Sequence, residues 1–385
     1  IRLNSKDPLG GICEVLMKNY LIKPKYDLLL VDEGQDFTAP FYQLCYKLSN
    51  NKKIVWAYDD FQNIFDVKIQ DERETFGKNA DGKYNVDFGR DKCANQDIVL
   101  KKCYRTPRYS LIAAFSLGLG IYNGKVLQRL DTNEHWNSLG FNVKKGNCAT
   151  GDEMIIERPT LNTPSYTNDN FPEGSIRYKC FSNIDEECKT IAKNISYDIT
   201  EENLLPEDIC VICLDKKNVS DYFIKIEKFL NINDIKTFNL LNTNGGNLSF
   251  TRESCVTLTT VNKAKGNEKG AVYICGADYI FMNPNNVVLR DMLFTAMTRT
   301  KGWLAISGCS DDFNKCIDEL KVLKANNFEL RFVQPSETET KTIENYSREQ
   351  TGIYEFFGKN IERLKQTGLS NDDILKQLQR LLRNE

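Results

Sequence analysis

The chain has 385 residues, enough for two or three domains with hydrophobic cores of their own. Hydrophobic residues make up 41% and charged residues 27%, as in an ordinary globular protein. The formal net charge of -2 excludes a basic field over the whole molecule, so nucleic-acid binding would need a local groove. The sequence has neither a signal peptide nor an apolar run of about 18 residues, so we expect no membrane insertion and a cytoplasmic location.

Cysteine usage points to the same compartment. The thirteen cysteines are scattered and lie mostly inside apolar runs, and the only histidine is His135. Cys210 and Cys213 have CxxC spacing, but no second CxxC accompanies them. We therefore expect buried, reduced thiols in a reducing cytoplasm, and neither zinc sites nor disulfides.

Along the chain, short apolar runs alternate with longer amphipathic stretches. The runs are apolar on both faces, as is typical of buried strands in a parallel sheet covered by helices. This alternation predicts an α/β fold. The expected strands are 26–31, 52–58, 97–103, 207–214, 254–261, 270–276 and 302–308, and the expected helices are 41–50, 110–122, 183–195 and 220–232.

Three segments break the alternation. Residues 71–97 and 142–174 are rich in Asn, Asp, Gly and Lys, and we expect long loops or small insertions there. Residues 335–385 are charged and predicted to form a helical tail. Within the tail, Ser370 is a plausible N-cap before an apolar face that includes Ile374 and Leu378. The tail could brace the fold or dock on a partner protein.

The stretch YDLLLVDEGQDF carries the first functional signal. An expected strand ends in Asp32 and Glu33, and ligands gather beyond the carboxyl ends of strands in open parallel sheets. One acid could hold Mg²⁺ while the other deprotonates an attacking water. Gln35 and Asp36 follow on the exit loop, where they could link the site to neighbouring elements. Taken alone, the two acids could equally be solvated residues at a strand end.

Four later pieces extend this signal. IVWAYDDFQNIF again ends in acids and continues to Gln62, and LKKCYRTPRYSLIAAF passes through Arg105 into a helix. VTLTTVNKAKGNEKGAVYICG reads as a strand, a basic loop and a second strand. RDMLFTAMTRTKGWLAISG runs from a helix through Arg299 into a strand.

In order and spacing, these five pieces resemble motifs II to VI of UvrD/Rep-type superfamily 1 helicases. VDEGQD is similar to the DExQD motif, AYDDFQNIF to GDxxQ, and CYRT to NYRS. TTVNKAKGNE is similar to TxHxxKGxE, and FTAMTRTKGWL to VAMTRAKxxL. The resemblance extends from Tyr26 to Gly308 and implies RecA-like P-loop NTPase lobes that use ATP and Mg²⁺ and act on single-stranded DNA, with RNA not excluded.

The resemblance also implies residue roles. Asp32 would bind Mg²⁺, Glu33 would be the catalytic base, and Gln62 would couple the γ-phosphate to the nucleic-acid track. Arg105 and Arg299 would neutralise charge on the transferring phosphoryl group. The remaining implied contacts are with the nucleotide at Gln35, Gly266 and Glu268, and with nucleic acid at Phe65, Thr260, Asn262 and Lys265.

Each assignment has a simpler alternative. Arg105 and Arg299 could be surface cations at helix ends, and Gln62 could be an ordinary loop residue. Lys263, Lys265 and Lys269 could form a solvated basic loop.

The sequence also departs from the family pattern. It contains no GxxxxGK[ST] phosphate loop, so the chain alone should bind ATP poorly; either it begins downstream of that loop or it is silent towards ATP. Motif III keeps Phe65 but has Val67 and Lys68 in place of a later aromatic residue and an arginine, and Asn262 replaces the usual histidine. The large inserted subdomain of the family is essentially absent, which puts processive unwinding in doubt.

These inferences predict three parts: residues 1–105 as the C-terminal part of a first RecA-like lobe, 106–334 as a second lobe, and 335–385 as the helical tail. The function expected from them is an ATP-dependent DNA helicase or translocase core, working beside a nuclease partner or in defence against foreign DNA. Its phosphate loop would come from a missing N-terminal segment of the same polypeptide. The alternatives are a non-hydrolysing scaffold and an ATP-gated sensor.

Overall fold

The computed structural model describes residues 7–59, 72–87, 100–130, 132–164, 176–242 and 249–336. Residues up to Gln334 form one compact unit, which is the part described below. The predicted helical tail, Gln62 and Phe65 lie outside the described residues.

A six-stranded parallel sheet forms the centre of this unit. Its strand order is β5-β10-β9-β6-β8-β7, and every neighbouring pair runs parallel. The strands are β5 (Ile176–Cys180), β6 (Ile209–Cys213), β7 (Lys236–Asn239), β8 (Cys255–Thr260), β9 (Lys269–Cys275) and β10 (Thr300–Gly308). The predicted α/β class and parallel sheet are confirmed, and the sheet is consistent with a RecA-like lobe. The pattern missed β5 and β7, which form the two edges.

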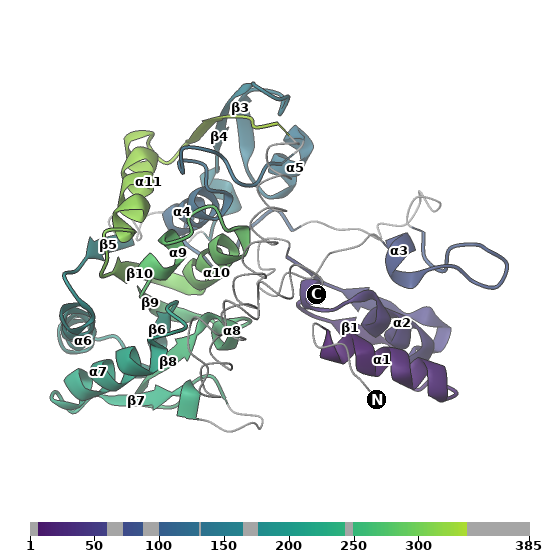
Figure 1. Cartoon of the computed structure of the whole chain (residues 1–385), viewed down its shortest axis with the longest axis horizontal. Coiled ribbons are helices and arrows are strands. Elements are labelled where there is room, and N and C mark those ends of the chain that lie inside the picture. The colour runs from purple at the N-terminus through teal and green to yellow at the C-terminus, as the bar shows by residue number, and fades with distance from the viewer. Residues whose placement is uncertain are drawn as a thin grey trace, which may run out of the picture. The chain divides into compact units, whose positions relative to one another are not determined.

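Helices cover both faces of this sheet because its strands are apolar on both sides. In β6, Cys210 and Ile212 face one core cluster, whereas Ile209 and Val211 face the other. The first cluster includes side chains of α4 (Arg108–Leu119), α10 (Val287–Met297) and α11 (Phe313–Ala325), with the short α8 (Val261–Ala264) and α9 (Asp278–Phe281). The second includes those of α6 (Ile184–Thr200) and α7 (Val219–Asn231), which lie across the sheet from α4 and α10 (Figure 1).

The N-terminal residues form a smaller α/β element. It contains α1 (Pro8–Asn19), β1 (Leu29–Val31), α2 (Ala39–Leu48), β2 (Ile54–Trp56) and α3 (Glu72–Phe76), with 3-10 turns at Gly34–Asp36 and Asn50–Lys52. β1 and β2 pair in parallel with Leu30 opposite Val55. Both strands were expected to be buried on both faces, and this was wrong. Leu30 is 73% exposed and Val55 57% exposed, whereas Trp56 is covered by Tyr42 of α2.

Two loop and strand expectations need correction. Within 142–174, β4 (Glu153–Glu157) pairs with β3 (Asn142–Lys145) on one side and with β11 (Leu330–Val333) on the other, in a small antiparallel sheet beside α5 (Asn133–Ser138). Met154 and Ile156 are fully buried, whereas Glu153, Ile155 and Glu157 alternate with them and are exposed or half-buried, so only one face of β4 is buried. Of the expected strand 97–103, residues 100–103 are not a strand, and Leu100 is 83% exposed.

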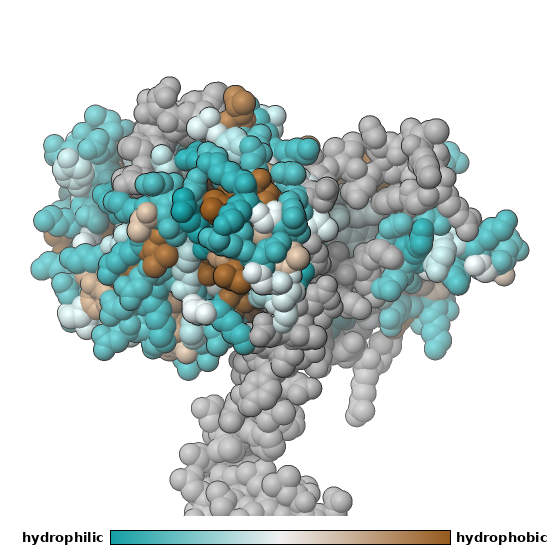
Figure 2. Space-filling model, turned by 90° about the horizontal axis from the view of Figure 1, so that it is seen from above, coloured by the Kyte–Doolittle hydropathy of each residue, from teal (hydrophilic) through white to brown (hydrophobic). Residues whose placement is uncertain are grey.

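The twelve cysteines in the described ranges are all free and most are buried, which confirms the predicted buried thiols for these residues. On the face drawn in Figure 2, the described surface is mostly hydrophilic with small apolar patches. Among the described helices, none combines the length and apolar character that a membrane span requires.

Candidate functional site

The acids that follow β1 and β2 lie side by side. Asp32 and Glu33 come directly after β1, and Asp59 follows β2 on the neighbouring parallel strand. The main chain ties the two strand ends together: the Ala57 amide donates to the Val31 carbonyl at 2.9 Å, and the Gly34 amide donates to the Ala57 carbonyl at 2.7 Å. Parallel pairing therefore places the carboxylates of both strands at one edge.

Glu33 has an unusual backbone conformation. Its φ of 52° and ψ of 43° are left-handed, which costs a non-glycine residue about 1–3 kcal/mol. The turn is held locally, because the Glu33 amide donates to Asp32 Oδ1 at 2.9 Å and the next residue has no side chain. A Cβ at Gly34 would lie 2.5 Å from the Tyr42 hydroxyl. Such strain is typical of functional sites, where it fixes the direction of a reacting side chain.

Gln35 joins the two strand ends through its side chain. It is 2% exposed, its Nε2 donates to Glu33 Oε2 at 2.6 Å, and its Oε1 accepts from the Asp59 amide at 2.9 Å. The expectation that Gln35 links the exit loop to a neighbouring element is thus confirmed. Its contact with a nucleotide stays a prediction. Asp59 was not nominated from the sequence, although its position at the end of a paired strand was the available signal.

Arg299 is buried where α10 leads into β10. It is 2% exposed, its Nε donates to the Thr295 carbonyl at 2.8 Å, and its Nη2 donates to Thr298 Oγ1 at 3.1 Å. Burial and, to a smaller extent, the nearby Arg105 lower the pKa of Arg299 to about 10, while Glu33 acts in the opposite direction. The side chain therefore still carries its charge at neutral pH. The surface-cation alternative is wrong for Arg299.

Arg105 precedes α4 and approaches the same region. Its side chain is 31% exposed, and its Nη1 donates to Glu268 Oε2 at 3.3 Å. Glu268 also lies 3.7 Å from the ammonium of Lys301. Arg105 is therefore held by an acid of the loop between α8 and β9 and is not a freely solvated cation.

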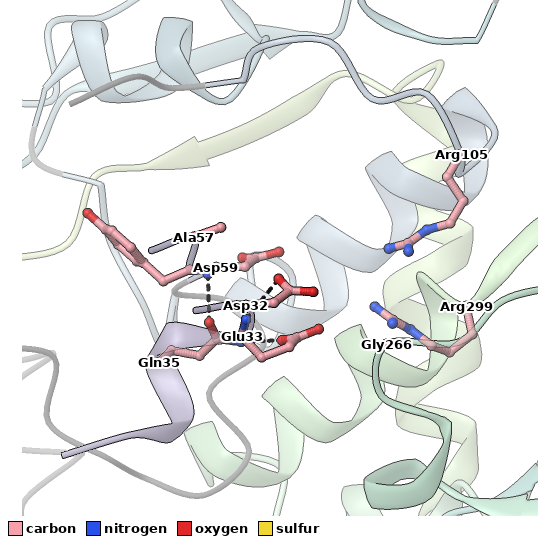
Figure 3. A pocket seen from close by; sticks show the side chains of 9 residues that line it. Asp32, Glu33, Gln35, Ala57, Asp59, Arg105, Gly266 and Arg299 are labelled. Carbon is pink, nitrogen blue, oxygen red and sulfur yellow. Dashed lines mark hydrogen bonds between the residues drawn. The ribbon is translucent and has the colours of Figure 1, made fainter. Parts of the chain in front are cut away.

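These side chains surround one cavity of about 260 Å³. Figure 3 shows the carboxylates of Asp32 and Glu33 on one side and the guanidinium groups of Arg105 and Arg299 on the other. The cavity could therefore hold a cation against the acids and an anion against the arginines. The residues that line it are Asp32, Glu33, Gln35, Ala57, Tyr58, Asp59, Arg105, Gly266 and Arg299.

The segment from the end of β8 to the start of β9 contributes the remaining predicted residues. Gly266 has a φ of 76° and lines the cavity, and Asn262 is exposed. Thr260, half-buried, ends β8. The Lys265 side chain is only 6% exposed and lies 2.5 Å from Asp36 Oδ1.

The basic-loop alternative is wrong for two of the three lysines. Lys265 is ion-paired with Asp36, and Lys269 is 3% exposed and donates to Thr251 Oγ1 at 2.7 Å. Lys263 is exposed, although its ammonium donates to the Leu240 carbonyl. Lys265 therefore anchors this loop, and Lys269 fixes the start of β9.

The side chains of the cavity fit Mg²⁺ and one phosphate group, but they do not provide a complete phosphate-binding loop. Mg²⁺ is usually held by one or two carboxylates together with waters and substrate phosphates, and Asp32 with Glu33 provides such a pair. No cluster of three or more metal-binding side chains occurs within the described ranges, so a cage made of protein alone is not formed there. Arg105, Arg299 and Gly266 suit an anion, but the sequence has no GxxxxGK[ST] loop to wrap the other phosphates.

Comparisons with known proteins gave a family match for part of the chain. Residues 256–307 match the family model for the UvrD-like helicase C-terminal domain. One similar solved structure is described as the C-terminal domain of a possible DNA helicase from Lactobacillus plantarum WCFS1; it is 14% identical and covers 39% of this chain and 83% of that chain. Its TM-score is 0.28, which is too low to carry an argument. No curated protein matches the sequence.

The resemblance to UvrD-type helicases is therefore confirmed, and it rests on a UvrD-like helicase C-terminal domain at residues 256–307. This range runs from the second residue of β8 to the last but one of β10. It includes six of the predicted site residues: Thr260, Asn262, Lys265, Gly266, Glu268 and Arg299.

Proposed function

We propose that this chain is part of an ATP-dependent DNA helicase or translocase, which hydrolyses ATP in the cavity described above and moves on single-stranded nucleic acid in the cytoplasm. The observation that supports this most is the meeting of opposite charges across one cavity. Asp32 and Glu33 come from the end of β1, whereas Arg105 and Arg299 come from segments far along the chain. Phosphoryl transfer is catalysed mainly by such positioning and charge neutralisation.

Each side chain has a role in this proposal. Asp32 holds Mg²⁺, which when bound neutralises phosphate charge, and Glu33 accepts a proton from the attacking water. Arg105 and Arg299 neutralise the charge that develops on the transferring phosphoryl group. Because the two arginines and the two acids belong to different segments, hydrolysis depends on those segments staying together.

The nucleic-acid contacts of the proposal lie beyond the cavity. Thr260 and the exposed Asn262 stand at the carboxyl end of β8, and we assign them to the nucleic-acid track together with Phe65. Gln62 would couple the γ-phosphate to that track. Lys265 is turned towards Asp36, so its predicted nucleic-acid contact has less support than theirs. Gln35, Gly266 and Glu268 would contact the nucleotide.

The test uses the polypeptide extended upstream through any phosphate loop that its gene encodes. Mg²⁺-dependent ATP hydrolysis is measured with and without single-stranded DNA, and with single-stranded RNA. We expect nucleic-acid-stimulated turnover, lowered about 10²–10⁴-fold by Glu33→Gln and about 10³–10⁵-fold by Arg299→Ala. Glu153→Gln and Arg331→Ala are matched controls, because both side chains lie on the small antiparallel sheet away from the cavity.

The outcomes separate the alternatives. Turnover that nucleic acid does not affect would indicate an ATP-gated sensor. A folded, full-length protein without turnover would leave a scaffold that binds nucleic acid or a nuclease partner, and the motor proposal would be wrong.

A further inference from the structure

Two segments that are 229 residues apart in sequence meet through one buried ammonium group. Lys265 Nζ lies 2.5 Å from Asp36 Oδ1 and 3.4 Å from Glu33 Oε2. The Lys265 side chain is 6% exposed and that of Asp36 is 18% exposed, so water screens this pair only weakly. The contact joins the turn after β1 to the loop between α8 and β9.

The surroundings make this contact selective for a positive charge. Burial raises the pKa of Asp36, and Lys265 counteracts that rise by favouring the carboxylate. Glu33 Oε2 is shared between the Gln35 amide and the Lys265 ammonium. If the ammonium were removed, two neighbouring acids would remain half-buried without their shared counter-charge, which is unfavourable.

We propose that Lys265 is an ionic latch, a positioning residue that holds the turn of Glu33 and Asp36 against the α8–β9 loop. This loop continues into Gly266, which lines the cavity, and Glu268, which holds Arg105. The latch therefore fixes the acids relative to an arginine. Its effect on catalysis rests on the proposed function, whereas its effect on the two segments does not.

The first test needs no activity. Amide hydrogen exchange is followed in the 385-residue chain, comparing wild type with Lys265→Met, Asp36→Asn and the exchanged pair Asp36→Lys with Lys265→Asp. We expect each single variant to raise exchange at residues 32–37 and 261–267 about tenfold or more, because the joined arrangement loses population. The exchanged pair and Lys265→Arg should recover much of the protection. Lys263→Met, a change of the same kind two residues away, should leave residues 32–37 as in wild type.

Unchanged exchange in folded Lys265→Met would overturn the latch, as would equal loosening by Lys263→Met. Failure of the exchanged pair to recover any protection would also count against it. In the full-length protein, kcat should fall for Lys265→Met and return in part for Lys265→Arg. If the exchange results are as expected but the full-length protein hydrolyses no ATP, the latch stands and the motor proposal fails. If ATP is hydrolysed but Lys265→Met leaves amide exchange unchanged, the motor proposal stands and the latch is wrong.

Discussion

The side-chain hydroxyl of Thr106 donates to the main-chain carbonyl of Thr298 at 3.2 Å. Thr106 directly follows Arg105 and Thr298 directly precedes Arg299, and the two threonines are 1% and 4% exposed. The two arginines of the cavity, although 194 positions apart, are therefore held by segments bonded to each other. Because a buried carbonyl is costly to leave without a donor, this bond keeps the two segments together and the arginines are positioned as a pair.

Thr106→Val should weaken this pairing while keeping the shape of the side chain. The Thr298 carbonyl would lose a buried donor, which costs about 1–3 kcal/mol of unfolding free energy. Misplacement of the arginines should lower ATP turnover of the full-length protein about tenfold or more. Thr106→Ser, which keeps the hydroxyl, should restore most of the turnover. Wild-type kcat in Thr106→Val would show that the bond has no part in positioning.

Gln35→Met should separate the ends of β1 and β2. Methionine has a similar volume but offers neither the acceptor for the Asp59 amide nor the donor for Glu33 that Gln35 provides. With the Asp59 amide left without this acceptor, we expect a loss of about 1–3 kcal/mol in unfolding free energy, measured by urea denaturation. Turnover of the full-length protein should also fall, because Glu33 loses the donor that Gln35 provides. Gln128→Met, at a half-buried amide outside the cavity, is the matched control for turnover. An unchanged turnover in Gln35→Met would contradict the bridging role.

A buried acid should make stability depend on pH. Glu187 is 0% exposed, and burial raises its pKa above the ordinary value of 4.5, although Ser307, Tyr222 and the Gly276 amide donate to it. The folded state thus retains a proton that the unfolded state has lost, so stability falls as pH rises above about 4.5 towards the raised pKa.

Glu187→Gln should remove this contribution. The difference in unfolding free energy between the variant and wild type should grow by about 1.4 kcal/mol per pH unit over that window, and then level off. Urea denaturation at a series of pH values measures it. Glu153→Gln, at an exposed acid, is the control, and parallel pH profiles for wild type and Glu187→Gln would refute the effect.

The ion pair between Arg290 and Glu319 should be the most costly to break. The side chains are 0% and 3% exposed, with Nη2 to Oε1 at 2.7 Å, and Arg290 also donates to the carbonyls of Leu117 and Pro284. Glu319→Ala would leave an uncompensated buried cation, so unfolding free energy should fall by about 3–5 kcal/mol in chemical denaturation. Lys321→Met removes an exposed pair with Asp318 and should change little. Equal effects of the two changes would contradict this account.

The sequence by itself determined the class of the fold and the chemical character of the site. Apolar runs such as 207–214 and 270–276 are strands between helix layers, as their pattern predicts. The same rule was wrong for runs 26–31 and 52–58, where Leu30 and Val55 are exposed. The acids of VDEGQD stood out because they directly follow an apolar run, whereas the arginines of CYRT and AMTRT were identified through the resemblance of their motifs to helicase motifs. Strands with one polar face, such as β3 and β4, lacked that contrast and were missed.

Only the tertiary structure decided which charges meet. Nothing in the local pattern distinguishes Lys265 from Lys263, yet the first is buried against Asp36 and the second is exposed. The bond from Thr106 to Thr298 was equally invisible, because both residues are ordinary polar residues in their own segments. The hydrophobic periodicity of a segment shows which of its faces packs against the neighbouring layer. The burial and pairing of individual charged and polar side chains depend instead on segments some two hundred residues apart, which meet only in the folded chain.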